Sequence, residues 1–170
     1  MPITIRRAVL DDAYDFALCK NKSWQSAYRG IVPDDYLEGL TVAVDKQAGL
    51  TRQWMNEQKD SEYYCVNENG EVVGVLVVNP CRDEDKPNAG EITAMYLLEE
   101  YWNKGYGREM MDFAMAALKR MKYTEIIIWV FEENERARNF YEKFEFAYDG
   151  TRKEFAFGVP LIGVRYTRKT

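Results

Sequence analysis

The residues around the turn at 103–108 are of the types that bind an anion. Gly105 and Gly107 leave their backbone N–H groups unobstructed, and an amphipathic helix is predicted to begin directly after them. Lys104 and Arg108 flank the glycines and add positive charge. Because the start of a helix also carries a positive dipole, this turn suits a pyrophosphate group.

Two other nucleotide-binding motifs are excluded at this turn. A P-loop requires Gly-Lys-Ser/Thr, whereas Gly107 is followed by Arg108 and Glu109. A Rossmann fingerprint requires a third small residue, and Met110 stands in its place. The ligand of this anion site therefore has to be inferred from the helices and strands around the turn.

The chain contains no histidine, which excludes Ser-His-Asp and Cys-His catalysts and His-ligated zinc. A general base must then be a carboxylate, a lysine, a tyrosine or a water, and we expect no metal. The three cysteines lack CxxC spacing and are typical of reduced thiols, which predicts a cytoplasmic protein.

Length and charge narrow the function classes further. With 170 residues, the sequence predicts one domain spanning 1–170. The net charge of −5 argues against nonspecific binding to nucleic acid or to an anionic membrane. No apolar run is long enough for a membrane helix, and the first residues lack a signal-peptide pattern.

Hydrophobic periodicity predicts the elements that position the turn. The predicted strands cover residues 2–7, 62–67, 71–78, 91–98, 124–131, 146–149 and 161–168. The predicted helices cover residues 13–28, about 42–57, 107–121 and 134–144, with a short helical turn after Pro33. This order predicts an α+β fold, in which a mixed, mostly antiparallel sheet of six or seven strands has helices on both faces.

Two motifs make the chain similar to the GNAT superfamily of N-acetyltransferases. Residues 102–107 resemble its signature Gln/Arg-x-x-Gly-x-Gly/Ala, with Trp102 replacing the first residue. Residues 134–146 resemble Asn-x-x-Ala-x-x-Phe-Tyr-x-x-x-Gly-Phe, with Glu145 replacing the glycine. The order of elements also fits, so the resemblance covers essentially the whole chain.

The resemblance implies acetyl-CoA as the acetyl donor. Its pyrophosphate would rest on the turn, and its pantetheine arm would pair with the preceding strand, which the family usually bulges and splays. The cofactor-binding residues that this implies are Met95, Tyr96, Leu97, Asn103, Lys104, Gly105, Tyr106, Gly107, Arg108 and Asn134. Asn134 is equally well explained as a helix N-cap.

The resemblance also implies the catalytic residues. Glu91 lies fourteen residues before Gly105, as the glutamate base does in one branch of the family; the alternative is a solvent-exposed glutamate at a strand end. Tyr141 would protonate the departing thiolate, although it also belongs to an apolar helix face. Trp24 and Tyr28 are candidates for binding the acceptor, and the alternative for both is simply core.

The sequence therefore predicts an N-acetyltransferase that acts by direct attack of a primary amine in a ternary complex. Acidity and aromatic residues favour a small-molecule amine as the acceptor. The alternatives are a protein N-terminal or lysine acetyltransferase, a non-catalytic acyl-CoA-binding module, and a domain that only binds partners. Exposed strands near the C-terminus are compatible with a homodimer.

Overall fold

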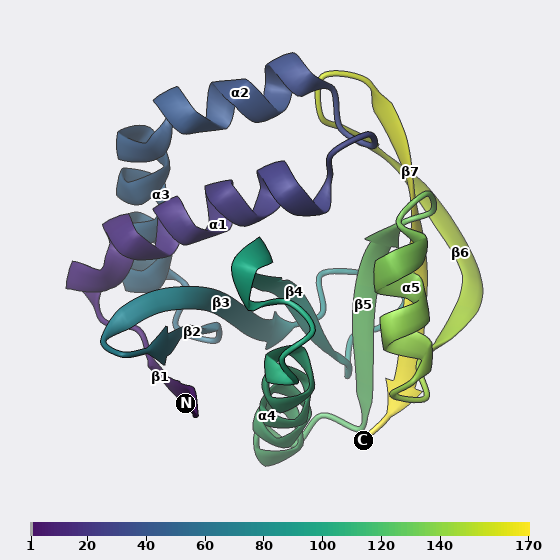
Figure 1. Cartoon of the computed structure of the whole chain (residues 1–170). Helices are drawn as coiled ribbons and strands as arrows, with labels where there is room; N and C mark the ends of the chain where they lie inside the picture. The colour runs from purple at the N-terminus through teal and green to yellow at the C-terminus, as the bar shows by residue number, and fades with distance from the viewer. Residues whose placement is uncertain (1) are drawn as a thin grey trace.

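The computed structural model describes residues 2–170 and contains a seven-stranded sheet in the order β1-β2-β3-β4-β5-β7-β6 (Figure 1). The strands are β1 (Thr4–Arg7), β2 (Glu62–Glu68), β3 (Glu71–Pro80), β4 (Gly90–Leu97), β5 (Glu125–Phe131), β6 (Ala147–Ala156) and β7 (Pro160–Lys169). The helices are α1 (Ala13–Ala27), α2 (Asp34–Val42), α3 (Val44–Glu57), α4 (Tyr106–Arg120) and α5 (Glu135–Glu142), with 3-10 turns η1 (Leu10–Asp12) and η2 (Glu99–Tyr101). Only β4 and β5 run parallel, so the predicted mixed, mostly antiparallel sheet is confirmed.

Helices cover both faces because strand residues are buried on alternating sides. On one face, Ile126 and Ile128 of β5 pack with Leu118 of α4 and with the apolar side of α5. On the other face, Cys65 and Val75 pack with residues of α1 and α3. The strand β5 is buried on both sides, which explains its unbroken run of apolar, mostly β-branched residues.

The two halves of the sheet separate between β4 and β5. These strands pair only at Gly90–Ile126 and Glu91–Ile127, and then diverge. A β-bulge in β4 leaves Thr93 without a register partner on β3, although its hydroxyl donates to Asn79 Oδ1 at 2.6 Å. The remainder of β4 therefore presents an open edge toward β5, and we call the space between the diverging strands the split.

Two predicted elements differ from the observed ones. The strand predicted at residues 146–149 continues to Ala156, and the short helical turn after Pro33 is the helix α2. β6 is an edge strand that pairs only with β7, so most of its side chains are exposed and polar. Such a strand carries little of the apolar alternation from which strands are predicted.

No helix within residues 2–170 is both long enough and apolar enough to cross a membrane.

Candidate active site

The turn before α4 is shaped to present backbone N–H groups. Gly105 is the N-cap residue, with a φ of 86° that favours glycine, and no side chain caps this helix. The N–H groups of Gly105 and Gly107 have no acceptor among residues 2–170. Unsatisfied N–H groups at the start of a fifteen-residue helix form an anion site.

The open edge of β4 lies directly before this turn. The N–H of Leu98 donates to Val73 on β3 at 2.9 Å, so the backbone groups of Leu98 face the paired side. Because these groups alternate along a strand, those of Leu97 and Met95 face the split. Of the three residues predicted to pair with pantetheine, Met95 and Leu97 have backbone groups on the open side, and Tyr96 does not.

A tyrosine cluster lies beside the split. The hydroxyls of Tyr28 on α1 and Tyr96 on β4 are 2.9 Å apart and hydrogen-bonded. The Tyr141 hydroxyl on α5 makes no hydrogen bond to any residue within 2–170. Burial, with a smaller contribution from Tyr96, raises the pKa of Tyr141 above its usual 10, and burial also raises the pKa of Tyr28 and of Tyr96. All three phenols are therefore protonated at neutral pH.

Glu91 occupies the closed end of the split, where β4 and β5 last pair. Its side chain is only 2% exposed, so the alternative of a solvent-exposed glutamate is wrong. Both carboxylate oxygens are engaged by Arg82: Nη2 donates to Oε2 at 2.7 Å and the backbone N–H to Oε1 at 3.2 Å. The hydrogen bond to Glu91 raises the pKa of Arg82, against the opposing effect of burial.

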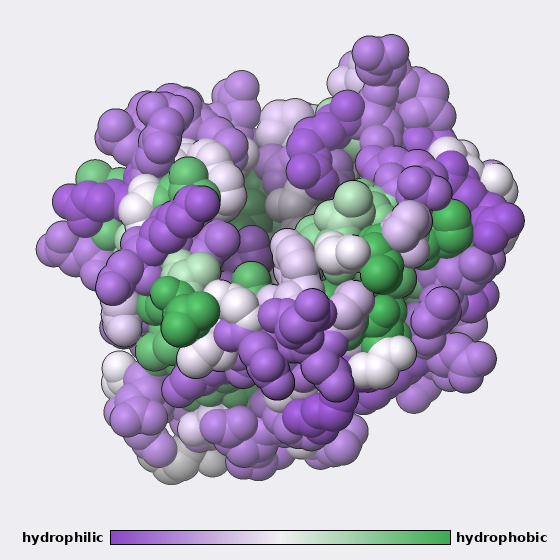
Figure 2. Space-filling model, turned by 90° about the horizontal axis from the view of Figure 1, so that it is seen from above, coloured by the Kyte–Doolittle hydropathy of each residue, from purple (hydrophilic) through white to green (hydrophobic). Residues whose placement is uncertain are grey.

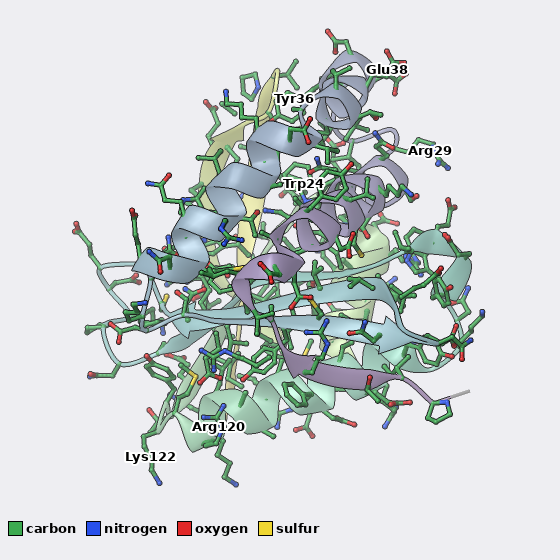
Figure 3. The ribbon with its side chains drawn as sticks, turned by 90° about the vertical axis from the view of Figure 1, so that its left-hand side faces the viewer. Trp24, Arg29, Tyr36, Glu38, Arg120 and Lys122 are labelled. Atoms are coloured by element: carbon green, nitrogen blue, oxygen red, sulfur yellow. The ribbon has the colours of Figure 1, made fainter. Side chains whose placement is uncertain are left out.

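The aromatic residues predicted to contact the acceptor gather between α1, α2 and the second half of the sheet. Trp24 packs edge-on against Tyr28 and Phe157, with ring centroids 4.8 and 5.2 Å apart. Tyr36 on α2 lies toward one end of the molecule, Trp24 on α1 lies further inside, and Arg120 of α4 lies at the opposite end (Figure 3). The indole Nε1 of Trp24 is buried and has no acceptor among the described residues.

A cavity of about 90 Å³ opens at the end of β5. It is lined by Ile31, Phe131, Glu132, Glu133, Pro160, Leu161 and Ile162. Its lining combines apolar side chains with Glu132 and Glu133, of which Glu132 is paired with Arg152. The face seen in Figure 2 is hollowed near its middle, and hydrophobic side chains flank this hollow on both sides.

The match to a family model shows to which family the chain belongs. The model of the acetyltransferase (GNAT) family matches residues 24–146, which is well over half of the chain and includes both motifs. The chain belongs to the GNAT acetyltransferase family. It is accordingly an acetyl-CoA-dependent acyltransferase by family, as the two sequence motifs predicted.

Individual relatives agree with this GNAT assignment. An uncharacterized N-acetyltransferase of Bacillus subtilis is 30% identical over 132 residues, which cover 78% of this chain and 73% of the relative. A spermidine N(1)-acetyltransferase of Thermoplasma acidophilum is 22% identical and covers 89% of this chain and 92% of its own. The crystal structure of the PaiA N-acetyltransferase of that organism, in complex with coenzyme A, superposes with a TM-score of 0.78 at 22% identity and covers 100% of both chains.

The remaining predicted cofactor residues are distributed around this GNAT site as follows. Asn103 has a φ of 62°, a conformation that asparagine tolerates, and Arg108 and Lys104 are exposed. Tyr106 differs, because its ring is 7% exposed and its hydroxyl donates to Glu68 on β2. The Tyr106 side chain is therefore engaged within the fold.

Asn134 caps α5, since its side chain accepts a hydrogen bond from the N–H of Ala137 at 3.2 Å. Sequence reasoning missed two contacts near the site, the hydrogen bond of the Tyr96 hydroxyl and the Arg82 partner of Glu91, and neither had a usable signal in the sequence. No group of three or more His, Cys, Asp or Glu residues within 2–170 is arranged to hold a metal ion.

Proposed function

We propose that the protein transfers the acetyl group of acetyl-CoA to a primary amine by direct attack in a ternary complex. Acetyl-CoA supplies an activated thioester and a thiolate leaving group. The observation that carries this proposal is that the open edge of β4 leads directly into the uncapped start of α4, while the Tyr141 hydroxyl on α5 makes no hydrogen bond within residues 2–170 and lies within electrostatic reach of Tyr96 on β4. The first two fit an extended ligand that has amides and a pyrophosphate.

In this proposal Tyr141 holds the proton that the departing sulfur needs. As the C–S bond breaks, the sulfur develops negative charge, and a phenol that is still protonated at neutral pH can donate its proton to that sulfur in the transition state. Burial keeps the pKa of Tyr141 above 10, which keeps this proton in place across the physiological range. The Tyr141 hydroxyl has no internal partner that would compete for the proton.

Glu91 is the proposed base for the acceptor ammonium, under one structural condition. Freeing the lone pair of a lysine-like amine at pH 7 costs about 4–5 kcal/mol, which a base lowers. The carboxylate is engaged by Arg82, so Arg82 has to release an oxygen before Glu91 can accept a proton. The Arg82 side chain is 68% exposed and can turn into solvent.

A small organic cation is the proposed acceptor. The cavity at the end of β5 pairs apolar walls with Glu132 and Glu133, and Glu133 forms no ion pair within residues 2–170. Phe131 lines this cavity and also contacts Tyr28, with ring centroids 5.0 Å apart. The relative that acetylates spermidine, a polycationic amine, supports the same class. Trp24 and Tyr28 would then form part of the aromatic wall that contacts the amine.

The test separates chemistry from binding. In Tyr141→Phe, kcat should fall by about 100-fold or more, as expected for loss of a general acid, while the Kd of acetyl-CoA stays unchanged. Tyr148→Phe is the matched control, because that ring is 44% exposed. Thiol release is measured with a panel of diamines, polyamines and lysine peptides.

The outcomes of these assays distinguish the candidate functions. Equal kcat values for Tyr141→Phe and the wild type would remove Tyr141 from the mechanism. Acetyl-CoA binding without turnover on any amine would identify a non-catalytic acyl-CoA-binding module. Turnover on lysine peptides in preference to small amines would contradict the proposed acceptor class.

A further inference from the structure

Trp102 and Arg136 bridge the mouth of the split from opposite sides. Trp102 lies between η2 and the glycine turn, and its Nε1 donates to the Leu97 carbonyl at 2.8 Å. That carbonyl is on the open edge of β4, so the indole covers the end of this edge. Arg136, in the first turn of α5, stacks on the indole with its guanidinium carbon 3.7 Å from the ring centroid.

The guanidinium of Arg136 has no anionic partner. Arg136 forms no ion pair and no hydrogen bond within residues 2–170, although Glu133 and Glu135 are near it in sequence. By contrast, Arg138 on the same helix donates to Tyr166 and to the Glu132 carbonyl. Arg136 therefore holds all its N–H donors available, on a side chain that the indole has already oriented.

The face of α5 that carries Arg136 is the face that meets the glycine turn. Phe140 follows Arg136 by four residues, so the two side chains share one side of the helix. A Cβ on Gly107 would lie 3.4 Å from the Phe140 ring, which is van der Waals contact. The free guanidinium thus stands one helical turn from the contact between α5 and the anion site.

We propose that Arg136 binds the diphosphate of acetyl-CoA and that Trp102 orients it for this role. This inference rests on the proposed function. The family signature has Gln or Arg at the position of Trp102, so this chain lacks a polar side chain there. In place of that side chain, α5 supplies the positive charge of Arg136 across the split. The Trp102 indole holds the guanidinium in position by stacking. A planar guanidinium suits this task because it can donate two parallel hydrogen bonds to phosphate oxygens.

The proposal is tested by calorimetric titration with three probes: acetyl-CoA, its 3′-dephospho form, and S-acetylpantetheine, which has no phosphate. Arg136→Met should weaken the first two by about tenfold or more, the expected loss of a charge-assisted hydrogen bond, and leave the third unchanged. Lys119→Met is the control, since it removes the same charge from an exposed site at the far end of α4. It should change none of the three Kd values by more than about twofold.

A double-mutant cycle tests the role of Trp102. Trp102→Ala should weaken acetyl-CoA binding in the wild type and have no further effect in the Arg136→Met background. Circular dichroism confirms that each variant is folded. Independent losses from the two substitutions would contradict the orienting role.

Four results of these titrations would contradict the proposal or the function on which it rests. Equal losses in Arg136→Met and Lys119→Met would overturn the proposal in favour of general electrostatics. A loss confined to acetyl-CoA, with the 3′-dephospho form unaffected, would place Arg136 on the 3′-phosphate and contradict the diphosphate assignment. An unchanged Kd would show that the stack only joins α5 to the segment before the glycine turn. Failure of the wild-type protein to bind acetyl-CoA would instead contradict the proposed function itself.

Discussion

At the scale of single residues, Glu91 and Arg82 form an ion pair at the closed end of the split. If Glu91 is the base, Glu91→Gln should lower kcat/KM by about 100-fold and remove the acidic limb of the pH–rate profile. Arg82→Ala should raise kcat/KM, because Arg82 no longer has to release a carboxylate oxygen before Glu91 can accept a proton. Arg52→Ala, an exposed arginine paired with Asp11, is the control.

The pH–rate profile of these variants separates catalysis from structure. If Glu91 only anchors the loop that carries Arg82, both variants should lose thermal stability while their pH profiles keep the wild-type shape. That result would contradict the assignment of Glu91 as the base.

The motifs predicted single residues better than they predicted the contacts of those residues. Tyr141 and Asn134 could be identified because they lie inside a recognisable pattern. The Arg82 contact could not, since it joins residues on either side of a polar loop. The Tyr96 hydroxyl was missed because the bulge at Thr93 shifts the alternation of side chains along β4.

At the scale of elements, the start of α5 has two overlapping roles. Asn134→Ala should destabilise the protein by about 1 kcal/mol, because the Ala137 N–H loses its acceptor. Asn134→Ser should restore that stability, since serine also caps helices. Urea unfolding measures the free energy, and calorimetry measures the Kd of acetyl-CoA.

The comparison of the two variants decides which role Asn134 has. A Kd that weakens in both Asn134→Ala and Asn134→Ser indicates a direct contact with the cofactor. A Kd that recovers in Asn134→Ser together with stability would contradict such a contact and leave only the cap.

The turn after α5 contains a strained residue. Glu145 stands where the family motif has glycine, and its φ is 66°. A residue with a Cβ in the left-handed conformation costs about 1–2 kcal/mol of folding free energy, and glycine avoids this cost. Part of the gain is lost again, because glycine loses more backbone entropy on folding. Glu145→Gly should therefore raise the unfolding free energy by about 0.5–1 kcal/mol.

Glu145→Ala is the matched control for this turn. It removes the same charge, and with it the 3.8 Å contact to Arg168, but keeps a Cβ. Equal stability of the glycine and alanine variants in urea unfolding would argue against backbone strain at this position.

Elements with a buried face were predictable, and elements at the edge were not. The central strand β5 shows its burial as an unbroken apolar run, and the hairpin at Asn69-Gly70 has a positive φ at both residues, as such turns require. β6 was predicted to end seven residues too early, because its exposed charged residues conceal the strand. The split depends on how β4 and β5 diverge from each other, and a sequence pattern within one strand does not show this.

At the scale of the whole molecule, one buried arginine ties distant segments together. The Arg165 side chain on β7 is 4% exposed and contacts three aspartates, at 3.1 Å from Asp83, 2.7 Å from Asp85 and 2.7 Å from Asp149. Burial would raise the pKa of Asp83, but hydrogen bonds from Arg165 and Trp129 hold it below its usual range. The network fastens the loop before β4 to the far half of the sheet.

Loss of this arginine should be costly. Arg165→Ala should lower the unfolding free energy by about 3 kcal/mol, since the largely buried Asp149 loses its counter-charge and Asp83 keeps only Lys153. Arg152→Ala removes a half-exposed pair with Glu132 and should cost less than about 1 kcal/mol. Similar costs for the two substitutions in urea unfolding would show that the Arg165 network contributes no more than a surface ion pair.

The most direct test of the central claim is the melting temperature with and without acetyl-CoA. At about one hundred times its Kd, a ligand that binds only the folded state adds about 2.7 kcal/mol of stability. For a domain of this size, the melting temperature should then rise by about 5–10 °C. The account predicts a rise of that size. An unchanged melting temperature with millimolar acetyl-CoA would contradict it.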